Sequence, residues 1–181
     1  MGKTSYCLGL QMHHFSGGVL LHQQAYVRKL LKHFQMDQAH ALATPMIGRS
    51  QTTEDPYQSC FEDGEIVNMQ KYLTAVGAFT YLITHTRPDI AFTTNILARH
   101  SQKPTARHWN GVKHLLRYLW GTEDLGLYYR RDIKCKITGY ADSGFKTDEV
   151  SGKSQTGYIF IKNGTPISWK SAKSPQLQRI T

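Results

Sequence analysis

The spacing of apolar residues changes once along the chain, and this change constrains the fold more than any other feature. Between residues 72 and 119, apolar side chains recur every three or four positions, which is typical of helices with one buried face. From residue 125 onward, short alternating runs are separated by turn residues, which is typical of antiparallel strands. The sequence therefore predicts an α+β protein in which a helical block and a sheet join around residues 121–126.

A hairpin and a basic amphipathic helix precede the helical block. Residues 5–10 and 18–22 are short apolar runs, and residues 13–18 between them are predicted to form a glycine-containing turn. From Gln23 to Phe34 the apolar residues follow a helical repeat. Residues 41–65 contain two prolines, two glycines and five acidic residues, which predicts an irregular linker.

Local signals divide the helical block into three helices. An apolar stripe from Tyr72 to Ile83 stops before Pro88, which suits the first turn of a second helix. Thr105 suits the N-cap of a third helix, and Gly121 is placed to end it. Beyond it, four strands at residues 125–130, 135–142, 156–161 and 166–170 are predicted to form a meander.

The charge of the chain favours an acidic partner. Its formal net charge is +9 and its isoelectric point is near 9.5, which favours nucleic acid first and a phospholipid surface second, while a merely solvated basic surface remains open. Residues 87–136 hold ten Lys and Arg against four acidic residues. The phosphate-contacting candidates are Arg87, Lys113, Arg117, Arg130 and Arg131, the last two following Tyr128 and Tyr129.

Cysteine and histidine spacing predicts neither a disulfide framework nor a metal site. The three cysteines lie far apart, which fits a reducing compartment. His108 and His114 are six residues apart and so lie on different helix faces, which favours solvated or core-edge histidines over ligands. No signal peptide or membrane span is recognisable. We therefore expect an intracellular protein, cytoplasmic or nuclear, with no membrane contact and no cofactor of its own.

Asp142 ends a predicted strand and is followed by small residues. A rigid strand can hold such a carboxylate against Mg²⁺, although an ordinary turn aspartate explains the pattern equally simply. Hydrolysis with two metal ions needs several converging carboxylates, and only Asp148 and Glu149 follow Asp142. Asp142 alone is a weak metal ligand.

Nine phrases in fixed order resemble the Pol polyprotein of copia-type retrotransposons across nearly the whole chain. They are Cys7-Leu-Gly-Leu-Gln11, residues 22–36, Thr44-Pro-Met46, Thr86-Arg-Pro-Asp-Ile-Ala-Phe92, His108-Trp109, residues 116–122, Gly139-Tyr-Ala-Asp142, Ser154-Gln-Thr-Gly-Tyr158 and Ile167-Ser-Trp-Lys170. The resemblance implies the end of a reverse transcriptase palm and a thumb-like helix in residues 1–56, a helical connection region in 57–124 and a partial ribonuclease H-like domain with an incomplete mixed sheet in 125–181.

The resemblance also implies which catalytic parts are present. Asp142 matches the first metal-binding aspartate of ribonuclease H, for which the parent family uses Mg²⁺. The polymerase aspartate pair lies upstream of Cys7 in the family, and the second ribonuclease H acid lies beyond Lys170 in a helix whose motif is not found here. We therefore expect a truncated Pol segment that is not an enzyme by itself.

Two functions follow from this reading. The first is residual, non-specific binding of nucleic acid, either an RNA–DNA hybrid or a duplex, with strong salt dependence. The alternative is a protein-interaction fragment whose helical block binds a fuller Pol chain or another protein, through apolar residues such as Trp109 and Trp120. An exposed sheet edge would favour this alternative. A fragment that does not fold stably is the third possibility.

Overall fold

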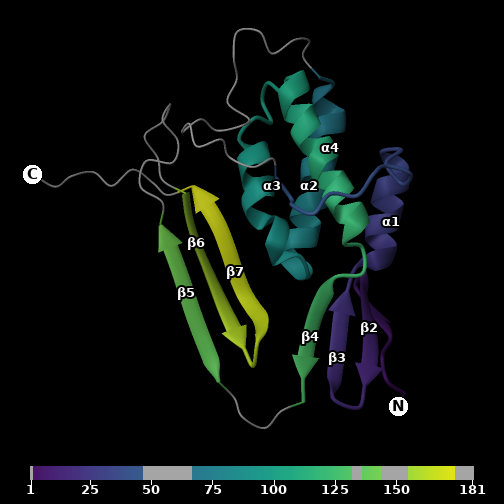
Figure 1. Ribbon diagram of the computed structural model, residues 1–181, viewed down its shortest axis with the longest axis vertical. Helices are drawn as coiled ribbons and strands as arrows, with labels where there is room; N and C mark the ends of the chain where they lie inside the picture. Colours follow the sequence, from purple (N-terminus) through teal and green to yellow (C-terminus); the bar gives the residue numbers. More distant parts are fainter. Residues whose placement is uncertain (1, 47–66, 132–135, 144–154, 174–181) are drawn as a thin grey trace, which may run out of the picture. The chain divides into compact units, whose positions relative to one another are not determined.

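The computed structural model describes residues 2–46, 67–131, 136–143 and 155–173 of the chain. It divides into two compact units, residues 1–131 and 132–181, each with its own sheet (Figure 1). Most of the predicted acidic linker lies outside the described residues. The α+β class predicted from the sequence is confirmed.

The first unit contains a four-stranded antiparallel sheet built from both ends of the unit. Its strands are β1 (Tyr6–Cys7), β2 (Leu10–Phe15), β3 (Gly18–His22) and β4 (Gly126–Arg130), paired in that order. The predicted turn at residues 13–18 is too long, because residues 13–15 continue β2 and pair with β3. Only residues 16 and 17 connect the two strands.

Four α-helices and one short 3₁₀-helix follow the predicted pattern closely. They are α1 (Gln24–His33), α2 (Met69–His85), η1 (Pro88–Ile90), α3 (Ala91–Ala98) and α4 (Ala106–Gly121). Asn68 caps α2 by accepting a hydrogen bond from the backbone N–H of Lys71. At the start of α4, the backbone N–H of Thr105 donates to Nδ1 of the buried His108, at 2.9 Å.

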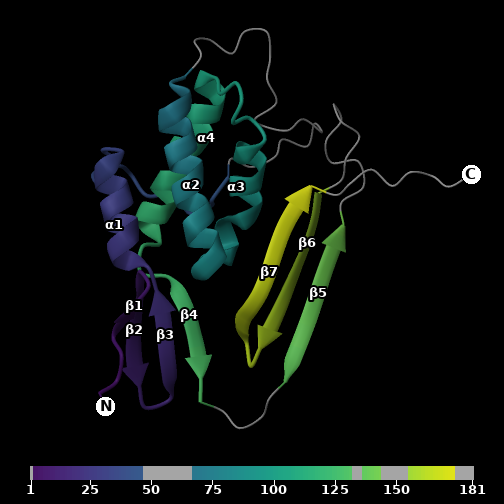
Figure 2. The same cartoon turned by 180° about the vertical axis from the view of Figure 1, so that it is seen from behind.

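The four helices share one apolar core. It contains the predicted stripe of α2, whose Tyr72 and Phe79 are fully buried, together with inward residues of α1, α3 and α4. Figures 1 and 2 show the helices packed together with the β1–β4 sheet at one end. Burying a large apolar side chain contributes about 1.5–3 kcal/mol. The shared core therefore stabilises α1 together with the three later helices.

The second unit contains a three-stranded antiparallel sheet. Its strands β5 (Ile137–Ser143), β6 (Gln155–Lys162) and β7 (Thr165–Lys173) are paired in chain order. The predicted turn at Asn163-Gly164 is confirmed, with φ of 51° and 86° at the two residues. Within the described residues all pairings are antiparallel, so the mixed sheet expected from the resemblance is not what the structure has there.

Strand β4 differs from the prediction in its partner. It was expected to open the C-terminal meander, but it pairs with β3, with Leu127 opposite Leu21 and Leu127 only 5% exposed. The division between the two compact units follows residue 131. Alternation identifies a strand but not its neighbour, because both sheets offer an antiparallel partner.

We predict that residues 125–131 stabilise the first unit. A chain of residues 1–131 should unfold cooperatively, while a chain of residues 1–124 should lose about 1.5–3 kcal/mol from Leu127 alone, besides the β3 pairing. Urea denaturation followed by circular dichroism measures the difference. Equal unfolding free energies of the two chains would show that β4 contributes nothing to this unit.

Candidate nucleic-acid interface

Arg87 lies at the centre of a polar cluster inside the first unit. Its guanidinium donates to both carboxylate oxygens of Asp89, at 2.7–3.2 Å, and to the backbone oxygen and Oγ1 of Thr122, at 2.9 and 2.7 Å. The hydroxyl of Tyr118 donates to Asp89 at 2.9 Å, and its ring centroid lies 5.6 Å from the guanidinium carbon. Burial, followed by the charge of Asp89, raises the pKa of Tyr118.

This geometry removes Arg87 from the phosphate-contacting candidates. Arg87 is 1% exposed, and its guanidinium N–H groups donate to Asp89 and Thr122. A buried guanidinium with matched acceptors holds the protein together and presents no charge to a ligand. The sequence reading was therefore wrong about the role of this arginine.

Arg28 forms a second ion pair, which links α1 to the residues after α4. Its Nη2 and Nε donate to the carboxylate of Glu123 at 2.6–3.1 Å, and the side-chain amide of Gln24 donates to the same carboxylate at 3.2 Å. The hydrogen bond from Arg28 lowers the pKa of Glu123. Glu123 is thereby neutralised within the unit.

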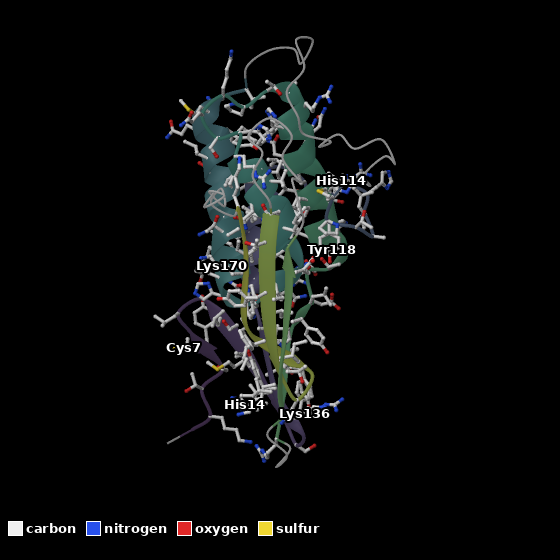
Figure 3. The ribbon with its side chains drawn as sticks, turned by 90° about the vertical axis from the view of Figure 1, so that its left-hand side faces the viewer. Cys7, His14, His114, Tyr118, Lys136 and Lys170 are labelled. Carbon is white, nitrogen blue, oxygen red and sulfur yellow. The ribbon has the colours of Figure 1, made fainter. Side chains whose placement is uncertain are left out.

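Lys113 and Arg117 lie one turn apart on α4, as predicted, but have different surroundings. Nε of Arg117 donates to the backbone oxygen of His40 at 2.8 Å, and the ring of His114 lies 2.9 Å from the backbone oxygen of Thr44. These contacts hold the segment after α1 against α4, on which Figure 3 labels His114 and Tyr118. Lys113 is exposed and remains available to an anion.

Arg130 and the exposed aromatic rings of the first sheet lie on one face. Phe15 and Arg130 flank Gly18 in register, and the ring of Tyr128 packs over this glycine. The rings of Phe15 and Tyr128 are 6.1 Å apart, and these residues are 51% and 37% exposed. We call Phe15, Tyr128 and Arg130 the sheet patch. Arg131 follows it directly and is also exposed.

The surface charge of the first unit is strongly positive. Its described residues include thirteen Lys and Arg and four Asp and Glu, an excess of nine. Two of the four acids, Asp89 and Glu123, are ion-paired with arginines inside the unit. Each ion pair balances one acidic residue with one basic residue, so the excess of nine positive charges remains.

Asp142 lies on β5 in the second unit, exposed and paired in register with Gly157. Asp148 and Glu149 lie outside the described residues. Within the ranges that the structure describes, no three His, Cys, Asp or Glu side chains are grouped as a metal site would need.

The histidines have other contacts: His108 stacks on His100, and His13 lies 4.8 Å from His22 between ring centroids. No helix in the described ranges is long and apolar enough to cross a bilayer.

Comparison with known proteins identifies the family. Over 94% of its length, the chain is 31% identical to the retrovirus-related Pol polyprotein from transposon TNT 1-94 of Nicotiana tabacum, and over 96% it is 32% identical to that from transposon RE2 of Arabidopsis thaliana. It covers 13% and 12% of these two polyproteins. This chain belongs to the copia-type retrotransposon Pol family.

A shorter relative aligns with part of the copia-type segment. The secreted RxLR effector protein 161 of Plasmopara viticola is 41% identical over 102 residues, which are 56% of the chain and 72% of that protein. No family model matches the chain, and no solved structure matches it.

Sequence reasoning missed Phe15 and Glu123 in this copia-type segment. Phe15 was placed in a turn, although the alternation of β2 continues through it and Ser16-Gly17 is a sufficient two-residue turn. Glu123 was counted only as an acid, because its partner Arg28 lies 95 residues earlier. No local pattern reports an ion pair of that separation.

We predict that Arg87→Lys destabilises the protein by about 1–3 kcal/mol, because buried acceptors lose their partners. Lysine keeps the charge, but its single ammonium cannot reach Asp89 and Thr122 together as the planar guanidinium does. Chemical denaturation measures the loss, with Arg130→Lys on the surface as the matched control, expected to change stability by less than about 0.5 kcal/mol. Equal effects of the two variants would contradict a structural role for Arg87.

We predict that His22 makes the first unit sensitive to acid. Burial, followed by the positive charge of His13, lowers the pKa of His22 from its ordinary value of 6.5. The contribution of neutral His22 to the free energy of unfolding is therefore complete above pH 6.5. It is lost as the pH falls below 6.5, because His22 then binds a proton more readily in the unfolded chain than in the folded one.

The test compares the unfolding free energy at pH 7.5 and 5.5 in wild type, His22→Gln and the exposed-site control His40→Gln. Wild type and His40→Gln should lose more stability on acidification than His22→Gln. Identical losses in all three proteins would exclude His22 as the source.

Proposed function

We propose that this copia-type Pol segment binds nucleic acid without sequence preference, through the sheet patch and the exposed cations of the first unit. The proposal is supported above all by the sheet patch, in which two exposed aromatic rings lie beside Arg130 on one sheet face. Aromatic rings stack on bases of any identity, and arginine attracts the adjoining phosphate.

The available cations define the expected contacts. Lys113, Arg130 and Arg131 are exposed, whereas Arg117 shares its guanidinium with the backbone of His40. Each phosphate neutralised by a lysine or arginine releases counterions, so affinity should fall steeply with salt. RNA–DNA hybrids and duplexes fit this electrostatic mode because it depends on backbone charge.

We propose that the segment acts inside the cell, in the cytoplasm or the nucleus.

We further propose that the segment alone does not cleave or extend nucleic acid. Asp142 corresponds to one metal-binding carboxylate, and a two-metal mechanism needs several that converge. In the sequence, Asp142 is followed only by Asp148 and Glu149. With Mg²⁺ present, Asp142 would contribute at most a weak ligand.

A protein partner, such as a fuller Pol chain, is the second candidate function. It is favoured by the apolar residues that the second sheet exposes: Ile137 is 57%, Tyr140 60% and Phe160 45% exposed. Binding of this kind would withstand salt and would depend on these side chains rather than on Lys113 or Arg130.

We predict that binding to a fluorescent 20-base-pair RNA–DNA hybrid weakens steeply between 50 and 200 mM salt. Arg130→Gln should lower the slope of log Kd against log salt by about 1, because one phosphate contact is lost. Phe15→Leu should weaken the binding of a fluorescent 20-nucleotide single strand, whose bases are unpaired, at every salt concentration, since about 1–3 kcal/mol of stacking per base is lost. Fluorescence anisotropy gives both quantities, with Leu73→Ala, an exposed apolar site on α2, as control.

The same samples, incubated with Mg²⁺, test the catalytic part of the proposal. The hybrid should remain intact in wild type and in Asp142→Asn. Cleavage by wild type that Asp142→Asn abolishes would overturn the inactive assignment. No binding of the hybrid at 50 mM salt would favour the protein-partner function instead.

A further inference from the structure

The first unit contains a half-open cavity of about 280 Å³ beside the Arg28–Glu123 ion pair. It lies between α1, the residues that follow α1, and the end of α4. Small-molecule sites in proteins typically measure about 300–1,000 Å³, so this cavity suits one planar group such as a nucleobase.

Two lining residues supply apolar surface. Leu31 is fully buried in the core, while Trp120 is half-buried, packs against the core and lines the cavity. An indole is the largest aromatic surface among the side chains and stacks favourably on heteroaromatic rings. The cavity therefore has the apolar component that a planar ligand needs.

The polar lining groups fall into two sets. Arg28 and Glu123 already satisfy each other through the ion pair described above. Lys32, Asp37 and Gln38 contribute an ammonium, a carboxylate and an amide, for which no side-chain partner occurs among the described residues. One positive and one negative group thus remain for a ligand.

The hydrogen bonds that a carboxylate can accept favour one nucleobase over the others. A carboxylate accepts hydrogen bonds only, and it accepts two at once from a donor with adjacent N–H groups. Guanine presents such a pair on its Watson–Crick edge, N1–H and N2–H, whereas adenine, cytosine and uracil do not. A lysine can then bind the guanine O6 or the adjoining phosphate.

We propose that this cavity binds one unpaired guanine of a single-stranded nucleic acid, stacked on Trp120 and held through its Watson–Crick edge by Asp37. Lys32 and Gln38 provide the remaining polar contacts. This inference rests on the proposed nucleic-acid binding and adds a base preference at one position, since the sheet patch itself does not distinguish bases.

The test measures the affinity of the full chain for two fluorescent 12-nucleotide RNAs, all uridine and uridine with one central guanine. At one fixed salt concentration, the guanine-containing RNA should bind about tenfold more tightly, as expected for a bidentate base contact. Asp37→Asn should abolish this preference while leaving the affinity for the all-uridine RNA and its salt slope unchanged. Trp120→Leu should weaken the guanine-containing RNA more than the all-uridine RNA.

The matched control is Lys113→Gln, which lies outside the cavity and should weaken both RNAs equally. A replacement of guanine by adenine or inosine separates the contacts further: inosine, which lacks the N2 amino group, should lose most of the preference, and adenine all of it.

Equal binding of both RNAs by wild type would overturn the guanine site while leaving the proposed function intact. A guanine preference that survives Asp37→Asn would overturn the assigned contact. Failure to bind either RNA at low salt would overturn both proposals, and an apolar peptide anchor would then be the better occupant.

Discussion

The buried guanidinium of Arg87 joins the parts of the first unit that carry its surface. It follows α2 directly, pairs with Asp89 in η1 and binds Thr122, the residue after α4. Strand β4 starts four residues beyond Thr122. The position of the sheet patch therefore depends on a contact made within the core, because Tyr128 and Arg130 follow the segment that Arg87 fixes.

Neighbouring contacts extend this connection to the N-terminal elements. The hydroxyl of Thr86 donates to the buried side-chain oxygen of Gln23 at 2.7 Å, next to the start of α1. Arg28 then ties α1 to Glu123. Polar groups of this kind stabilise a protein only when each has a partner, and removing one member leaves the others unsatisfied. The ends of α2, α4 and the beginning of α1 consequently form one cooperative structure.

The sequence predicted the positions of helices and strands well, but it predicted poorly which strands and side chains contact each other. Periodicity located the helices to within a few residues, and Asn163-Gly164 identified a turn, because both signals act over fewer than five residues. Strand β4 was assigned to the wrong sheet, since its partner β3 lies more than a hundred residues earlier. Charge counting could not distinguish buried Arg87 from exposed Arg130, although the composition correctly indicated a basic surface. The phosphate contacts themselves remain predictions.

The contacts at both ends of the segment from residue 47 to 66 have a consequence for chain variation. His114 meets the backbone oxygen of Thr44, and the backbone N–H of Val67 donates to that of Pro104, so both ends are held beside α4. Pro104 lies two residues before α4 begins at Ala106, whereas His114 lies within the helix. Residues inserted into α4 between Pro104 and His114 would therefore move these two contacts apart.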